Sequence, residues 1–362
     1  MKLTIKNIRA RAVMAPIKRP PVSASGAIPA AALVLIDIET SGGITGSSYI
    51  FAFQQRMLKA TVAGVEAMAE IIQGDALAPY EIEARMRRSL TLLDSHGIIG
   101  QAIAGIDMAV WDVYAKALGV PLACALGGAV KPIRAYNSCG LWIQDPARVA
   151  DEAAQLMQEG GFNAVKLRIG RPDFKQDLAA VRNVKKRIGN DACLMTDFNQ
   201  SLSVSEALMR GRALDEEGLY WIEEPIRHDN YSGCAKIAAE VKTPVQIGEN
   251  FLNTFEMQKA IEAGAAEYYM PDVQRIGGVT GWMRAAALAH ANGLDMSSHL
   301  FPEFSAHLLA VTPTCHWLEY MDWGNSILRE PFVIKEGQVL IPERLGAGIE
   351  WDEKAVQRYL VL

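Results

Sequence analysis

The chain has 362 residues, half of them hydrophobic, and a formal net charge of −5 at pH 7. This length suits two domains, or one large barrel with an appended domain. The mildly acidic balance argues against nucleic acid and anionic membranes as partners. The five cysteines lack CxxC or CxxH spacing, and the sequence has neither a signal-peptide pattern nor eighteen consecutive apolar residues. We therefore expect a cytoplasmic protein without a disulfide framework, a zinc site or a membrane span.

The first 125 residues show strand patterns followed by helical patterns. LTIKNIRARAV and AALVLIDIET alternate like strands, and the segment between them, IKRPPVSASGAIPA, has the composition of a loop. SSYIFAF predicts a third strand. IIGQAIAGIDMAVWDVYAKALGV predicts a long helix that ends at Gly119 and Pro121. Strands followed by helices are typical of an α+β domain, which we place at residues 1–125.

The pattern then changes to short apolar strands separated by helices. Eight such strands recur at intervals of roughly 20–30 residues: IRAYNSC, AVKLRIG, CLMTDFN, YWIEEP, VQIGEN, YYMPDV, DMSSHL and HWLEY. This alternation predicts a (β/α)₈-type barrel over residues 126–325. No clear helix follows HWLEY, and REPFVIKEGQVLIPERLGAGIEW has the pattern of strands and turns. We expect the tail, residues 326–362, to leave the barrel and pack on the N-terminal domain.

Three strands of the predicted barrel end in a carboxylate. Asp197 ends CLMTD, Glu223 lies in YWIEEP and Glu249 ends VQIGE, each about one strand-helix unit apart. The carboxyl ends of barrel strands meet at one mouth, so these groups should lie together. They would repel one another without a cation between them, and an all-oxygen site favours Mg²⁺ or Mn²⁺. Any one of them could instead cap a helix N-terminus, but three in succession favour the metal.

Other strands contribute cations and a histidine to the same mouth. Lys166 and Arg168 alternate with apolar residues in AVKLRIG, so their side chains share one face. Asp272, His299 and Glu319 end the last three strands, and an aspartate beside a histidine can orient the imidazole and raise its basicity. A metal flanked by cations and a His–Asp pair suits abstraction of a proton α to a carboxylate.

The ordered set KxR, DFNQ, EEP, GEN, MPD, SSH and LE resembles the enolase superfamily, and specifically its mandelate racemase subgroup. QRIGGVTGW, MSSHLF, SAHLLAVTPT, AGIDMAVWD and the C-terminal GIEW extend the similarity along nearly the whole chain. The resemblance implies a modified (β/α)₇β TIM-like barrel with an N-terminal α+β capping domain that the C-terminal tail completes. It also implies one essential Mg²⁺, for which Mn²⁺ could substitute, and a homo-oligomer, with an octamer as one candidate.

The resemblance also implies roles for individual residues. The metal ligands would be Asp197, Glu223 and Glu249. His299, paired with Asp272, would be one α-proton base. A protonated Glu319 would donate a hydrogen bond to the substrate carboxylate, and Lys166 would contact that carboxylate from the other side. Further substrate contacts would come from Ser138 and Asn199 and from an apolar group, namely Val22 and Ile28 in the capping loop with the nearby Phe51 and Phe53. Packing between domains would explain the apolar group equally well.

Arg168 departs from the family pattern. The subgroup motif is KxK, in which the second lysine is the base for the opposite enantiomer, whereas a guanidinium stays protonated in proteins. Arg168 is therefore a compromised base, an anion clamp or a partner in an ion pair, and we favour the last two together over the base.

Three functions remain open from the sequence. The first is racemisation of an apolar or aromatic 2-hydroxy acid through a metal-stabilised enolate, which needs two opposed bases. The second is dehydration of a sugar acid to a 2-keto-3-deoxy acid, with Arg168 as a clamp on the substrate. The third, and least favoured, is a non-catalytic binding protein. In the first two readings the partner is a small carboxylate substrate.

Overall fold

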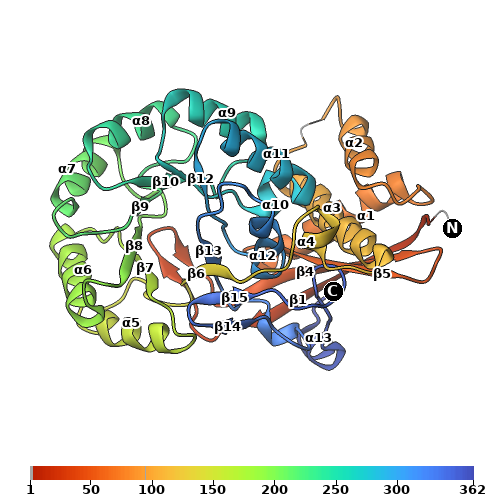
Figure 1. Cartoon of the computed structure of the whole chain (residues 1–362), viewed down its shortest axis with the longest axis horizontal. Helices are drawn as coiled ribbons and strands as arrows, with labels where there is room; N and C mark the ends of the chain where they lie inside the picture. Colours follow the sequence, from red (N-terminus) through yellow and green to blue (C-terminus); the bar gives the residue numbers. More distant parts are fainter. Residues whose placement is uncertain (1–2, 94) are drawn as a thin grey trace.

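The computed structural model describes residues 3–93 and 95–362, which form a capping domain beside a barrel (Figure 1). The capping domain holds an antiparallel sheet in the order β1-β4-β5. A two-stranded hairpin lies in the predicted loop between β1 and β4, and helices follow the sheet. The strands are β1 (Ile5–Pro16), β2 (Val22–Ser23), β3 (Gly26–Ala27), β4 (Ala30–Thr40) and β5 (Thr45–Phe51), and the helices are η1 (Gln55–Met57), α1 (Leu58–Ile72), α2 (Pro79–Ser89), α3 (Gly97–Leu118) and α4 (Leu122–Ala125).

Helix α3 is the buried core helix of the capping domain. It ends where the sequence predicts, because Gly119 takes the left-handed conformation, with φ of 74°, that closes a helix. Among the described residues it is the one helix long and apolar enough to cross a membrane, and 72% of its apolar window is buried inside the protein. Its Asp107 joins the two domains by accepting hydrogen bonds from the backbone N (2.9 Å) and Oγ1 (2.6 Å) of Thr280. Burial raises the pKa of Asp107 to about 7.

The barrel contains all eight predicted strands, and they lie around it in the order in which they occur in the chain. Each of the first seven is followed by a helical segment, and these helices form the outer ring in Figure 1. The strands are β6 (Ile133–Asn137), β7 (Ala164–Arg168), β8 (Cys193–Asp197), β9 (Ile222–Glu223), β10 (Val245–Ile247), β11 (Tyr268–Tyr269), β12 (Asp295–Met296) and β13 (Leu318–Tyr320). The helices are α5 (Val149–Gln158), α6 (Phe174–Ile188), α7 (Val204–Leu214), α8 (Tyr231–Glu240), α9 (Thr254–Ala263), α10 (Val273–Ile276), α11 (Gly278–Ala291) and α12 (Pro302–Ala310).

The barrel closes without an eighth helix. Strand β13 pairs in parallel with β6, and the backbone N of Ser298 donates to the carbonyl of Trp317 across the gap between β12 and β13. Because the chain leaves β13 through the short turn η2 (Asn325–Ile327), the architecture is the modified (β/α)₇β barrel with an N-terminal capping domain.

The tail differs in part from the sequence expectation. Strands β14 (Val333–Lys335) and β15 (Gln338–Leu340) form a hairpin that stays on the barrel, because β15 pairs with β6. The later segment, which includes α13 (Glu353–Tyr359), reaches the capping domain, where Trp351 Nε1 donates to Asp37 and the backbone N of Val361 donates to Ala12. The domain boundaries at residues 125 and 325 stay a prediction.

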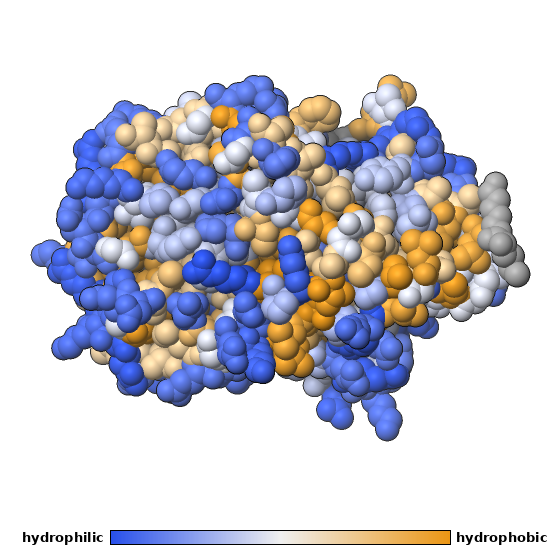
Figure 2. Space-filling model, in the orientation of Figure 1, coloured by the Kyte–Doolittle hydropathy of each residue, from blue (hydrophilic) through white to orange (hydrophobic). Residues whose placement is uncertain are grey.

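The surface follows the amphipathic pattern of the barrel helices. Figure 2 shows a mostly hydrophilic rim over the barrel, and more apolar surface over the capping domain and the region where the domains meet. The apolar faces of the helices are turned inward, so the ring encloses a rigid set of parallel strands whose carboxyl ends carry the site.

Candidate active site

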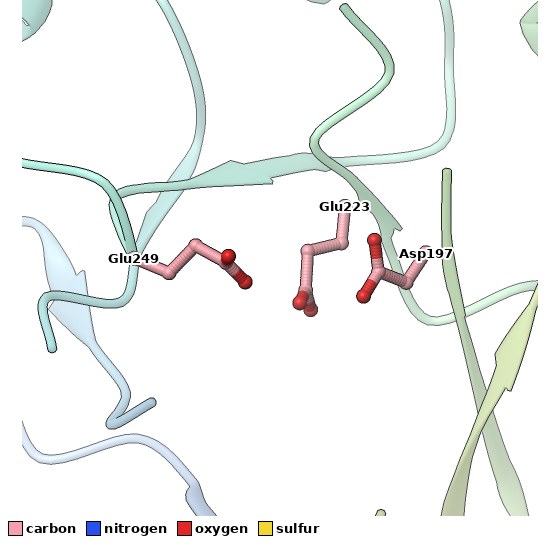
Figure 3. A group of neighbouring side chains, drawn as sticks. All are labelled: Asp197, Glu223 and Glu249. Carbon is pink, nitrogen blue, oxygen red and sulfur yellow. The ribbon is translucent and has the colours of Figure 1, made fainter. Parts of the chain in front are cut away.

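The three predicted carboxylates converge at the mouth of the barrel (Figure 3). Asp197 ends β8 and pairs in register with Glu223 at the end of β9, and Glu249 follows β10 by two residues. One oxygen from each lies within 4.8 Å of the others. Gly248 is required before Glu249, because its φ is 132° and an added Cβ would lie 2.9 Å from the backbone N of Met270.

The donor set is chemically suited to Mg²⁺. All three side chains offer carboxylate oxygens, which are the ligands that Mg²⁺ prefers, and all three residues are largely or fully buried. Burial raises the pKa of Glu223 to about 8, although Lys166 works in the opposite direction. Gathering three such groups is costly unless a cation balances them. Asp197, Glu223 and Glu249 could therefore hold the metal that the sequence predicts.

Lys166 lies among these carboxylates with 1% of its surface exposed. Its Nζ contacts Glu223, and lies 2.8 Å from Glu319 Oε1 and 3.4 Å from Asp197 Oδ2. Burial lowers the pKa of Lys166, but the surrounding carboxylates outweigh it and raise the pKa well above its usual value. Lys166 is thus a cation at the site, suited to holding a substrate carboxylate or a developing oxyanion.

The guanidinium of Arg168 is held by hydrogen bonds to the loop after β6. Its Nη1 donates to the carbonyls of Ser138 (3.1 Å) and Gly140 (3.3 Å), and its Nη2 donates to Ser138 Oγ (2.8 Å). The guanidinium also lies 3.7 Å from a Glu319 oxygen and 4.1 Å from the centre of the Trp142 ring. These contacts hold it as a buried cation that joins the loop after β6 to the acidic residues of the site.

His299 and Asp272 form the predicted pair. Nδ1 of His299 lies 2.7 Å from Asp272 Oδ2, so the aspartate accepts the Nδ1 proton and leaves Nε2 for other partners. Nε2 lies 3.4 Å from Glu249 and 3.8 Å from Glu319. Burial lowers the pKa of His299, but Glu249, Asp272 and Glu319 together raise it to about 9. The ring therefore lies beside both the predicted metal site and the predicted binding site for the substrate carboxylate.

Glu319 differs from the sequence expectation of a protonated carboxyl. Burial raises its pKa, but Lys166, His299 and Arg168 outweigh burial and hold the pKa well below its usual range. Glu319 is consequently ionised beside these three cations. Ser138, which the resemblance makes a substrate contact, donates from Oγ to Glu319 Oε1 at 2.7 Å and lies behind Glu319 and Arg168 rather than on the cavity wall.

A cavity of about 480 Å³ lies over these residues, between the barrel mouth and the β2–β3 hairpin. Of the residues for which the resemblance implies substrate contact, its wall includes Ile28, Phe53 and Asn199 but neither Val22 nor Phe51. Val22 is 43% exposed to solvent. The prediction for Phe51 assumed a strand that continues to Phe53. Instead β5 ends at Phe51, whose ring packs on Phe53 and Trp323, and Phe53 turns into the cavity with φ of 60°.

Sequence reasoning missed several polar residues on the cavity wall. Glu224, Asn250 and Arg275 follow the strands that carry Glu223, Glu249 and Asp272, and all three line the cavity. Trp142 and Trp323 line it as well. The available signal was their position directly after the strand-end motifs, but alternation along an ideal strand would turn Glu224 away from the site.

Comparison with known proteins decides the family. Residues 5–127 match the mandelate racemase / muconate lactonizing enzyme N-terminal domain, and residues 148–355 match the enolase C-terminal domain-like family. The chain belongs to the enolase superfamily, in its mandelate racemase subgroup. Members of this superfamily with similar structures hold Mg²⁺, and together with the carboxylate triad they establish the protein as a magnesium-dependent enzyme of the superfamily.

Two solved superfamily structures are similar over essentially the full length. An enolase from alpha proteobacterium BAL199 with bound magnesium is 44% identical, with a TM-score of 0.97, and 99% of this chain and 100% of that chain are covered. An enolase from Bradyrhizobium, complexed with magnesium and mandelic acid, is 39% identical, with a TM-score of 0.96, and 100% of this chain and 99% of that chain are covered. Among curated proteins, the L-talarate/galactarate dehydratase of Salmonella typhimurium is 30% identical over 90% of this chain and 81% of its own length.

Proposed function

We propose that the protein dehydrates a polyhydroxylated 2-hydroxy acid by a one-base mechanism, giving a 2-keto-3-deoxy acid. The observation that carries this proposal is the set of hydrogen bonds that the Arg168 guanidinium makes. The guanidinium donates to Ser138 and Gly140, and guanidinium groups do not serve as general bases in proteins, so Arg168 offers no second base. A site with one base is better matched to elimination than to inversion, which requires a proton donor on each face of the enolate.

His299 would carry both proton transfers. Because its pKa is about 9, the ring must first lose its Nε2 proton to act as a base. With Nδ1–H donated to Asp272, it then takes the α-proton at Nε2, and the electron pair of the C–H bond moves into the substrate carboxylate as an enolate forms. Lys166, the buried cation whose Nζ lies 2.8 Å from Glu319 Oε1, holds that carboxylate. Magnesium held by Asp197, Glu223 and Glu249 would supply positive charge that stabilises the enolate oxygens.

The second step returns the proton. As the enolate collapses, the C–O bond to the 3-hydroxyl group breaks, and His299 gives its Nε2 proton to the departing oxygen, so that water leaves. The resulting enol then becomes the 2-keto acid. Several acid-sugar dehydratases are 24–30% identical to this chain, which supports elimination as the outcome.

Racemisation of an aryl 2-hydroxy acid is the second candidate. It is favoured by the apolar part of the cavity wall, where Ile28, Phe53, Trp142 and Trp323 lie, and by the mandelic acid in the Bradyrhizobium neighbour. It would require a proton from the Arg168 side of the site, for example from a water molecule. Homo-oligomeric assembly and a cytoplasmic location remain predictions from the sequence.

A screen of acid sugars tests the proposal. Pentonates, hexonates and hexarates are incubated with enzyme and Mg²⁺, and 2-keto acids are detected as semicarbazones. We expect at least one product, lost on chelation of Mg²⁺ and in His299→Asn. No product across the panel, together with interconversion of mandelate enantiomers, would favour the second candidate and contradict the first.

A further inference from the structure

Glu223 is the middle member of the predicted metal triad (Figure 3), and its two carboxylate oxygens have different surroundings. Oε2 accepts a hydrogen bond from Trp221 Nε1 at 3.0 Å and a second one from Gln246 Nε2 at 3.2 Å. Oε1 contacts Lys166, the cation of the site. Trp221, Glu223 and Gln246 are each 0% exposed, so both donors belong to the protein interior behind the ligand.

Strand geometry places both donors beside Glu223. Trp221 precedes Glu223 by two residues, so the two side chains share one face of the chain, and Gln246 on β10 pairs in register with Glu223 on β9. The Trp221 ring is fixed by its neighbours: the Tyr136 ring meets it edge-on at 5.4 Å between centroids, and the Tyr268 ring does so at 6.3 Å. The indole N–H therefore stays in place if the carboxylate turns.

Two hydrogen bonds to one oxygen limit how Glu223 can bind a metal. A carboxylate has about four lone-pair positions on its two oxygens, and the two donors occupy both positions of Oε2. Only Oε1 is then left for the ion. A single oxygen suits Mg²⁺, which is small and requires near-octahedral geometry, whereas the larger Ca²⁺ takes six to eight oxygens and often binds both oxygens of a carboxylate.

We propose that Trp221 and Gln246 are positioning residues that restrict Glu223 to one metal-binding oxygen and so set the preference of the site for Mg²⁺ over Ca²⁺. The residues touch neither the cavity nor the predicted metal position, and they act through the carboxylate that they hold. The proposal goes beyond the proposed function, because it applies equally to elimination and to racemisation. It concerns the selection of the ion, which the triad of carboxylates alone does not explain.

Metal binding to the substrate-free protein tests the proposal. Calorimetry measures Kd for Mg²⁺ and for Ca²⁺ at one pH and ionic strength, after the protein has been treated with a chelator and dialysed. Trp221→Phe keeps an aromatic ring but has no N–H, and Gln246→Met removes the other donor at similar length. Trp282→Phe is the matched control, because Trp282 is also 0% exposed and loses one indole hydrogen bond, at 3.1 Å to Thr312 Oγ1, away from the cavity.

We expect Trp221→Phe and Gln246→Met each to weaken Mg²⁺ binding roughly tenfold, as for loss of a group that orients a metal ligand, and to change Ca²⁺ binding by less than about threefold. The ratio of the two dissociation constants should therefore move toward Ca²⁺, and Trp282→Phe should change neither constant. If one variant does not fold, as judged by far-UV circular dichroism, the other decides. Unchanged binding of both ions would overturn the proposal. Equal weakening of both ions would overturn it too, because the donors would then support the site without selecting the ion.

Discussion

Replacement of Arg168 by methionine separates a buried structural cation from a catalytic base. The guanidinium makes three hydrogen bonds to the loop after β6, two of them to backbone carbonyls, and is 4% exposed. Methionine keeps much of the apolar stem but donates no hydrogen bond. The carbonyls of Ser138 and Gly140 would lose their donor, and Glu319 would keep Lys166 as its remaining nearby permanent cation.

The magnitude follows from the burial of this network. Breaking a buried charge network by removing one partner costs about 3–5 kcal/mol, because charges and acceptors are left uncompensated. We therefore expect Arg168→Met to lower the free energy of unfolding by about 3–5 kcal/mol. Arg168→Lys keeps the charge but not the planar fork that reaches Ser138 Oγ and the two carbonyls together, so its loss should be smaller, about 1–2 kcal/mol.

Urea unfolding, followed by tryptophan fluorescence and far-UV circular dichroism in the absence of Mg²⁺, measures both variants. Arg227→Met is the control, since Arg227 lies on the surface and pairs with the exposed Asp229, and no measurable change is expected there. If Arg168→Met unfolds within 1 kcal/mol of the wild type while α-proton exchange is lost, Arg168 acts in the chemistry and our interpretation of its contacts is refuted.

Three further changes have defined outcomes. Asp272→Asn keeps the hydrogen bond to the backbone N of Arg275 but removes the carboxylate that accepts from His299. The rate of α-proton exchange, measured by NMR, should therefore fall roughly 100-fold or more, with Mg²⁺ affinity unchanged. An unchanged exchange rate would contradict the pairing of His299 with Asp272. Glu249→Gln should weaken Mg²⁺ binding by at least about tenfold in calorimetry, and equal affinity would remove Glu249 from the ligand set. For Asp107, the folded carboxyl keeps its proton up to a pH of about 7, whereas the unfolded one loses it near pH 4, so stability falls as the pH rises between these values. In urea unfolding, the free energy of unfolding of the wild type relative to that of Asp107→Asn should fall by up to roughly 3–4 kcal/mol from pH 4 to pH 8. A difference between the two proteins that does not change with pH would contradict the burial argument.

The parts of the site predicted from sequence are those that strand geometry alone determines. Asp197, Glu223 and Glu249 recur one strand-helix unit apart, and parallel strands in a barrel carry such residues to one mouth without any knowledge of loops. The His299–Asp272 pairing follows in the same way, because the two residues end neighbouring strands and form a parallel bridge.

The parts that could not be predicted depend on backbone that leaves the strand conformation. Phe53 and Glu224 both have positive φ, which turns them toward the cavity against the alternation of an ideal strand. The partners of Arg168 lie in the loop after β6, whose path is set by packing between distant segments. The ionised state of Glu319 likewise arises from Lys166, His299 and Arg168, which meet only in the folded chain.

The central claim, a single base at His299, is tested most directly by proton NMR of each mandelate enantiomer with enzyme and Mg²⁺ in D₂O. The account predicts that the α-proton of one enantiomer alone exchanges with solvent, without inversion, and that His299→Asn abolishes this exchange. Exchange of both enantiomers with interconversion would contradict it, because a proton would then reach the second face of the enolate from the Arg168 side.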